Sequence, residues 1–136
     1  MRRSEKALVV LLRASALLLL VAVVPAVMPF EWMKVTHRWL GLGELPEGPI
    51  IGYLTRSLSA LYAVHGALVY YVSLDVRRHL PVIRCLAVLS IVFGASMIVL
   101  DRAVGMPVWW IVCEGPFIIA LGAAILWLAA KTENAT

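Results

Sequence analysis

The chain has 136 residues, of which 62% are hydrophobic and only 15% are charged, and its mean hydropathy is +0.93. Soluble domains carry roughly 45–50% apolar and about 25% charged residues, so this composition excludes a water-soluble globular core. It also excludes a disordered chain, a disulfide scaffold and, despite the net charge of +4, a nucleic-acid-binding domain.

Four apolar runs are long enough to cross a bilayer, whose core of about 30 Å needs roughly 20 helical residues. They cover approximately residues 7–28, 50–74, 81–100 and 107–130. Each run is predicted to be helical, because lipid offers no hydrogen-bonding partner to an exposed backbone. Short loops after the second and third runs favour antiparallel neighbours. The sequence therefore predicts a single all-α membrane domain over residues 1–136, an antiparallel four-helix bundle.

The first run also has features of a secretory signal peptide, since it follows a basic start and ends in Val24-Pro25-Ala26. Three features argue against cleavage. Arg13 splits the apolar stretch, the run is long for a signal-peptide core, and Pro25 disrupts the small-residue cleavage pattern. We therefore expect this run to be retained as a transmembrane helix.

The segment from Pro29 to Leu40 separates the first and second runs. Its residues Phe30, Met33, His37 and Leu40 recur at helical spacing, with Trp32 and Trp39 beside them. This pattern predicts a short amphipathic helix that lies on the outer membrane surface. The alternative is an irregular loop whose tryptophans anchor it to headgroups.

Positive charges between the runs predict the orientation, because cytoplasmic loops retain Lys and Arg. One side carries seven of them, and the other carries three: Arg2, Arg3, Lys6, Arg77, Arg78, Arg84 and Lys131 against Lys34, Arg38 and Arg102. Both termini are therefore expected on the cytoplasmic side.

Two opposite charges are expected at matching depth in the membrane. Arg56 in the second run and Glu114 in the fourth lie about 9–11 Å below the predicted outer surface, at 1.5 Å per residue. A charge in the membrane costs about 2.5–3.5 kcal/mol, so we expect Arg56 and Glu114 to form an ion pair. Asp101, at the outer end of the third run, is expected to be a second acceptor for the guanidinium.

This predicted pair has two interpretations. In the functional one, a polar site opens outward, Arg56 holds an anionic group and Glu114 is a titratable acid beside a kink at Pro116. In the structural one, the pair fixes helix register and the kink is merely tolerated. Stripes of small residues indicate close helix packing beside both charges: Gly52, Ser59, Ala60, Ala63, Gly66 and Ala67, and in the third run Ala87, Ser90 and Gly94.

His65 lies in the middle of the second run, about half a turn around the helix from Arg56. It is a candidate haem or metal ligand or proton relay, but no second histidine lies inside an apolar run, so a packing role is favoured. A quinone pocket would need an apolar opening lined by Tyr62, His65 or Trp110. Cys85 and Cys113 fall at opposite ends of the membrane, beyond disulfide reach within one chain. No metal and no cofactor are therefore expected.

Several short motifs carry a family resemblance: Arg56, Asp75-Val-Arg-Arg-His79, Asp101-Arg102 with Gly105-Met-Pro107, and Glu114-Gly-Pro116. With four helices and short loops, residues 50–130 resemble the small DoxX-like membrane proteins. The resemblance implies a four-helix bundle in a bacterial inner membrane, often without assigned activity, with some members linked to quinone or thiol redox systems. The chain has no CxxC motif, which does not favour the thiol branch.

We therefore expect a multi-pass protein of a bacterial inner membrane. An accessory or assembly protein organised around the Arg56–Glu114 pair is favoured over an enzyme. The alternatives are a small proton-coupled carrier that uses Glu114 and a quinone- or lipid-handling membrane subunit. The expected partners are the lipid bilayer and either a second copy of the chain or other membrane subunits, with no nucleic acid.

Overall fold

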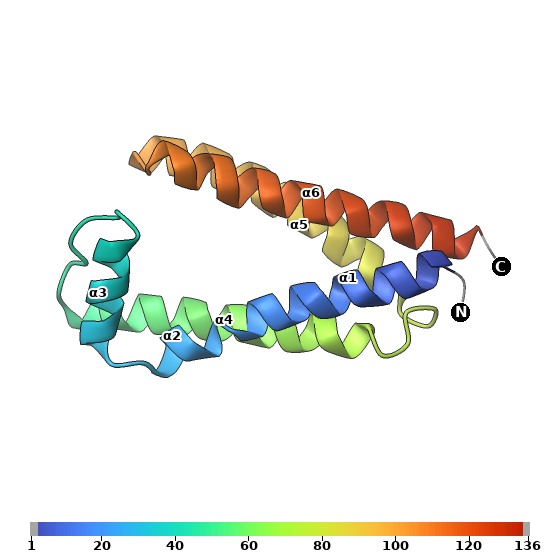
Figure 1. Cartoon of the computed structure of the whole chain (residues 1–136), viewed down its shortest axis with the longest axis horizontal. Coiled ribbons are helices and arrows are strands. Elements are labelled where there is room, and N and C mark those ends of the chain that lie inside the picture. The colour runs from blue at the N-terminus through green and yellow to red at the C-terminus, as the bar shows by residue number, and fades with distance from the viewer. Residues whose placement is uncertain (1–2, 135–136) are drawn as a thin grey trace. The chain divides into compact units, whose positions relative to one another are not determined.

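The computed structural model describes residues 3–134, and all regular structure in this part of the chain is helical (Figure 1). The helices are α1 (Arg3–Leu20), α2 (Val23–Val27), α3 (Phe30–Trp39), α4 (Pro49–Val72), α5 (Leu80–Val104) and α6 (Val108–Glu133). The all-α character predicted from the sequence is thus confirmed: the second, third and fourth apolar runs each form one long helix, and the first forms α1 and α2. Arg2, one of the charges used for the orientation, lies outside the described residues.

Three helical stretches are long and apolar enough to cross a membrane: residues 3–27, which combine α1 and α2, together with α5 and α6. Only 22%, 17% and 17% of their apolar windows are buried. Large apolar side chains such as Leu17 and Val99 are 59% and 69% exposed. A water-soluble monomer rarely exposes apolar patches of such extent, so this surface is suited to lipid. Helix α4, which carries Arg56 and His65, is not among the three.

The first apolar run is interrupted, whereas the sequence predicts one continuous helix over residues 7–28. Pro25 explains the break, because its nitrogen cannot donate to the carbonyl of Val21 and its ring crowds that group. The Val21 oxygen instead accepts from Val24 N at 3.0 Å. Met28 then takes an extended conformation with ψ 154°, as residues before proline do, and Pro29 leads into α3.

The chain forms two compact units. The first, here called the hairpin unit, comprises the residues up to Ala14 and those from Val69 onward, and it contains α5 and α6. The second, the loop unit, comprises Ser15–Leu68 and contains α2 and α3. Helices α1 and α4 contribute residues to both units.

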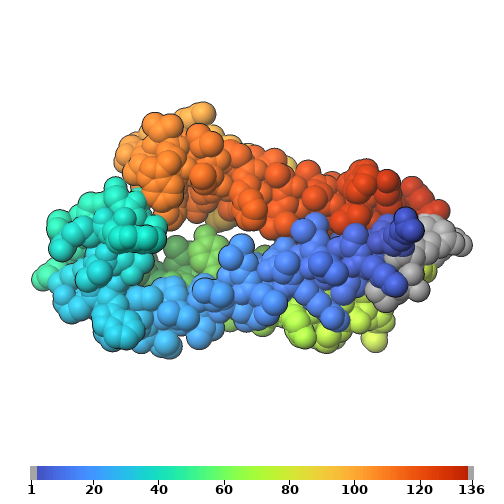
Figure 2. All heavy atoms as spheres, viewed as in Figure 1, coloured from blue at the N-terminus to red at the C-terminus, as the bar shows by residue number. Residues whose placement is uncertain are grey.

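In the hairpin unit, α5 and α6 lie side by side in opposite directions, and Figure 2 shows α6 as an unbroken band of atoms. The two backbones touch at glycines. A Cβ at Gly94 would lie 2.8 Å from the carbonyl oxygen of Gly115, and one at Gly122 would lie 2.8 Å from that of Ala87. The predicted small-residue stripe on α5 is therefore a packing surface, and Ala87, Gly94 and Asp101 on it are buried.

The best-buried apolar residues of the hairpin unit come from four helices. They are Leu8 of α1, Val72 of α4, Ile83 and Ala87 of α5, and Ala129 of α6, each no more than 1% exposed. Ion pairs within this unit involve Arg77, which donates to Glu5 at 3.0 Å, and Arg84, which pairs with Glu133. Charges that the sequence analysis placed on the cytoplasmic side thus also hold helices and loops together.

In the loop unit, the C-terminal part of α1 packs against α4 at a glycine. A Cβ at Gly66 would lie 2.9 Å from Cβ of Leu19 and 3.0 Å from the carbonyl oxygen of Ala16. Helix α3 confirms the short helix predicted between the first and second apolar runs. Its Met33 is buried, while Trp32 and Trp39 are 65% and 82% exposed.

Candidate functional site

Arg56 is a half-buried residue of α4 whose guanidinium binds backbone carbonyls. Its Nη1 donates to the Ala26 oxygen and its Nη2 to the Met28 oxygen, both at 3.0 Å. These carbonyls lie where α2 ends, and the last carbonyls of a helix have no partner within it. A cation there is also stabilised by the helix dipole. Arg56 therefore caps α2 from a position 28 to 30 residues further along the chain.

Ion pairs hold the loop after α3 against that helix. Arg38 donates from Nε and Nη2 to the two carboxylate oxygens of Glu44, at 3.0 and 2.9 Å. Lys34 donates to Glu31 at 3.0 Å and also pairs with Glu47. The hydrogen bond from Arg38 lowers the pKa of Glu44, and that from Lys34 lowers the pKa of Glu47.

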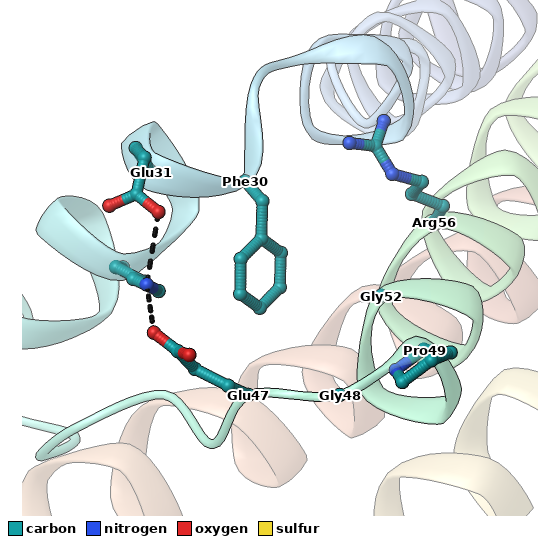
Figure 3. A pocket seen from close by; sticks show the side chains of 8 residues that line it. Phe30, Glu31, Glu47, Gly48, Pro49, Gly52 and Arg56 are labelled. Atoms are coloured by element: carbon teal, nitrogen blue, oxygen red, sulfur yellow. Dashed lines mark hydrogen bonds and ion pairs between the residues drawn. The ribbon is translucent and has the colours of Figure 1, made fainter.

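A cavity of about 400 Å³ lies between α3, the following loop and the start of α4 (Figure 3). The residues around it are Phe30, Glu31, Lys34, Glu47, Gly48, Pro49, Gly52 and Arg56. Its cations already have partners, since Lys34 bonds to two carboxylates and Arg56 to two carbonyls. The cavity therefore combines one aromatic ring with charges that the protein itself satisfies.

Glu114 lies on α6 and accepts a hydrogen bond of 2.6 Å from Nε1 of Trp110, one turn earlier on the same helix. The side chain of Asp101, from α5, lies within hydrogen-bonding reach of Glu114. Asp101 is only 5% exposed, and its Oδ2 has no hydrogen-bond partner among the described residues. The structure thus brings two of the predicted site residues together, as a pair of acids.

The other predicted contact of the site is the one between Arg56 and Glu114. Arg56 belongs to the loop unit and Glu114 to the hairpin unit, and each has its own partners there. The predicted Arg56–Glu114 ion pair therefore stays a prediction. In the hairpin unit, the acid Glu114 is the neighbour of Asp101, which we had expected beside the guanidinium.

Tyr62 and His65 are half-buried on α4, and they are not among the residues that line the cavity. Within residues 3–134, no group of three or more His, Cys, Asp or Glu side chains is arranged to hold a metal ion. Cys85 and Cys113 are free, exposed thiols.

Sequence reasoning missed the indole donor of Glu114 and the ion pairs between α3 and the loop that follows it. Trp110 and Glu114 are four residues apart, the spacing at which helical side chains meet, so this contact could have been predicted from the sequence. The Arg38–Glu44 and Lys34–Glu47 pairs could not have been predicted in this way, because they depend on the path of a glycine-rich loop.

No protein-family model matches the sequence, and no curated protein and no solved structure matches it significantly.

Proposed function

We propose that this protein is a four-span protein of a bacterial inner membrane, with both termini in the cytoplasm, and that it serves as an accessory or assembly protein. Three spans rest on the apolar helical stretches described above. The fourth is α4, whose 24 residues extend about 36 Å at 1.5 Å per residue, enough for a core of about 30 Å. The bonds from Arg56 to two carbonyls reduce the cost of its charge in lipid.

The observation that carries this proposal is that apolar side chains cover the outside of the helices, whereas the charged side chains form bonds within the chain. Large apolar residues point outward along the helices, as Leu61, Val64 and Val99 do at 64%, 66% and 69% exposure. The charged groups instead bind the chain to itself, through Arg56 on α2 and through ion pairs at the helix ends. The exposed surface of these helices is largely apolar. It suits contact with lipid, with a second copy of the chain and with neighbouring membrane subunits.

The remaining features agree with this proposal. Exposed Trp32 and Trp39 suit α3 to the outer membrane–water interface, where tryptophan is enriched. The resemblance to small DoxX-like proteins, which often have no assigned activity, also favours an inner-membrane four-helix bundle.

Native mass spectrometry after gentle extraction tests the accessory role. We expect the chain to leave the membrane with at least one further polypeptide, either another subunit or a second copy. A harsh detergent applied to the same sample is the control and should release the monomer. A monomer in every mild detergent and in lipid nanodiscs would contradict the proposal.

A second candidate function is a small proton-coupled carrier that uses Glu114. It is favoured by one observation, the buried Asp101 oxygen without a hydrogen-bond partner beside that acid. Proteoliposomes carrying a pH gradient test it. A carrier dissipates the gradient when its substrate is supplied, and Glu114→Gln abolishes this flux while Glu44→Gln, in the exposed loop after α3, preserves it. An assembly protein gives no flux in any of the three samples.

A further inference from the structure

The hairpin unit brings two acids together near the turn between α5 and α6. Asp101 is only 5% exposed, and its side chain lies within hydrogen-bonding reach of Glu114. Within the described residues of this unit, neither acid forms an ion pair with a Lys or Arg. Two adjacent carboxylates that both carry a charge repel each other, and a buried oxygen without a donor adds a desolvation cost. The arrangement therefore needs a cation between the two groups.

We propose that Asp101 and Glu114 form a proton-binding site in which the two carboxyl groups share one proton. The pair then carries a single negative charge, and the O–H of one acid donates to a carboxylate oxygen of the other. Such charge-assisted O–H···O⁻ bonds are short and strong. The inference goes beyond an accessory role and holds whether or not the protein carries a substrate.

The hydrogen bonds around Asp101 and Glu114 support one proton shared between them. Trp110 Nε1 already donates to Oε2 of Glu114, so the indole satisfies one oxygen of the pair. The Oδ2 atom of Asp101 is buried and has no partner within residues 3–134. A shared proton gives the Asp101 carboxyl group a hydrogen-bonded partner that no other described side chain provides.

The surroundings favour a proton over a larger cation. No cluster of three metal-ligating side chains is present in the described chain. On α5, the neighbouring cation Arg102 is exposed, and on α6 the neighbouring thiol Cys113 is exposed as well. Next to Glu114, Gly115 packs directly against Gly94 and Ile98, so apolar contacts close the hairpin beside the acids.

Infrared spectroscopy of the full chain in lipid tests the proposal directly. We expect a protonated carboxylic-acid band at neutral pH in the wild type. Glu114→Gln and Asp101→Asn should each remove this band, because an amide N–H replaces the shared proton and the remaining acid ionises. Glu44→Gln, which alters an exposed acid of the loop after α3, is the matched control and should leave the band unchanged.

The indole N–H of Trp110 provides a second readout. Its NMR signal, assigned with Trp110→Phe, should shift when the wild-type protein is titrated to a pH at which the proton leaves. The same signal should stay in place in Glu114→Gln. Both wild-type measurements remain valid if a variant fails to fold. The absence of a protonated band in the wild type at neutral pH would overturn the proposal, as would a band that persists in both substituted proteins.

Discussion

At Arg56, backbone carbonyls take the place that a carboxylate usually has beside a guanidinium. The acceptors exist because Pro25 interrupts the first apolar run and Pro29 follows its end, which leaves the carbonyls of Ala26 and Met28 without helical partners. Sequence reasoning looked for an opposite charge at the same depth and proposed Glu114. Backbone acceptors carry no residue signature, so the bonds to Ala26 and Met28 could not be predicted from side-chain types, and the Arg56–Glu114 ion pair stays a prediction.

Replacing Arg56 should therefore destabilise the fold through α2. Arg56→Ala removes two hydrogen bonds from a charged donor, each worth about 1.5–3 kcal/mol, so we expect the free energy of unfolding to fall by about 3 kcal/mol. Arg56→Lys should lose roughly half as much, because an ammonium lacks the fork that reaches two acceptors. Unfolding in detergent micelles measures both, with exposed Arg102→Ala as a control of little effect. Wild-type stability in Arg56→Ala would contradict this assignment.

A double-mutant cycle compares the contacts in the structure with the ion pair predicted from the sequence. Because Arg56 bonds to carbonyls and Glu114 to Trp110, the costs of Arg56→Ala and Glu114→Gln should add to within about 0.5 kcal/mol. The four unfolding free energies give the coupling. A coupling well above 1 kcal/mol would instead establish the pair predicted from the sequence.

At the scale of elements, the contact of α5 with α6 depends on glycine. The Cβ of an alanine at Gly115 would overlap the side chain of Ile98 and lie 2.7 Å from the carbonyl oxygen of Gly94. Backbone cannot yield as the end of a flexible side chain can, so overpacking of this kind costs typically 1–3 kcal/mol. The small-residue stripe on α5 was visible in the sequence, whereas the facing glycines of α6 were recognised only in the structure.

Gly115→Ala should consequently lower the stability of the hairpin by about 1–3 kcal/mol. Gly52→Ala is the matched control, since a Cβ there meets nothing within 4 Å on α4. Alanine in a helix is favoured over glycine by about 0.5–1 kcal/mol, so the control should be neutral or slightly stabilising. Thermal unfolding in micelles measures both variants. Equal changes in the unfolding temperature of the two variants would contradict the prediction that the close backbone approach at Gly115 requires glycine.

The loop after α3 should loosen in acid. The hydrogen bonds from Arg38 and Lys34 lower the pKa values of Glu44 and Glu47 in the folded protein. A group with a depressed folded pKa stabilises the fold above its unfolded pKa, near 4.3 for Glu, and this contribution is lost as the pH falls through the folded value. The amides of Gly41 and Leu42, which bond to carbonyls of α3, should therefore be protected from exchange at neutral pH and lose part of this protection, relative to an unstructured chain, below about pH 4. Protection that does not change across this range would contradict the prediction, and Glu44→Gln should already be less protected at neutral pH.

At the scale of the whole molecule, hydropathy determined what could be predicted. The existence and approximate extent of the apolar helices follow from the solvent, because lipid forces backbone groups to pair within a segment. The division into two units and the ion pairs of the outer loop depend on where the chain turns, which neither hydropathy nor helical spacing specifies. The proximity of Asp101 and Glu114 was partly foreseeable, since both were placed near the outer ends of adjacent runs.

Orientation in the membrane can be measured on the full chain. In a background with Cys85→Ser and Cys113→Ser, the outer-loop variant Glu44→Cys should react with a membrane-impermeant maleimide on intact cells. Arg78→Cys, in the loop between α4 and α5, should react only after permeabilisation. This follows from the excess of positive charge on the predicted cytoplasmic side. The reverse pattern would overturn the assigned topology.

The capping of α2 by Arg56 has a consequence for biogenesis. Helix α4 carries a guanidinium that costs about 2.5–3.5 kcal/mol to insert, and it is not among the stretches apolar enough to cross a membrane by composition. Its acceptors, at Ala26 and Met28, are translated about thirty residues earlier. A nascent chain therefore already holds the acceptors for Arg56 when that residue leaves the ribosome. In the proposed four-span arrangement, insertion of α4 then depends on the segment that preceded it.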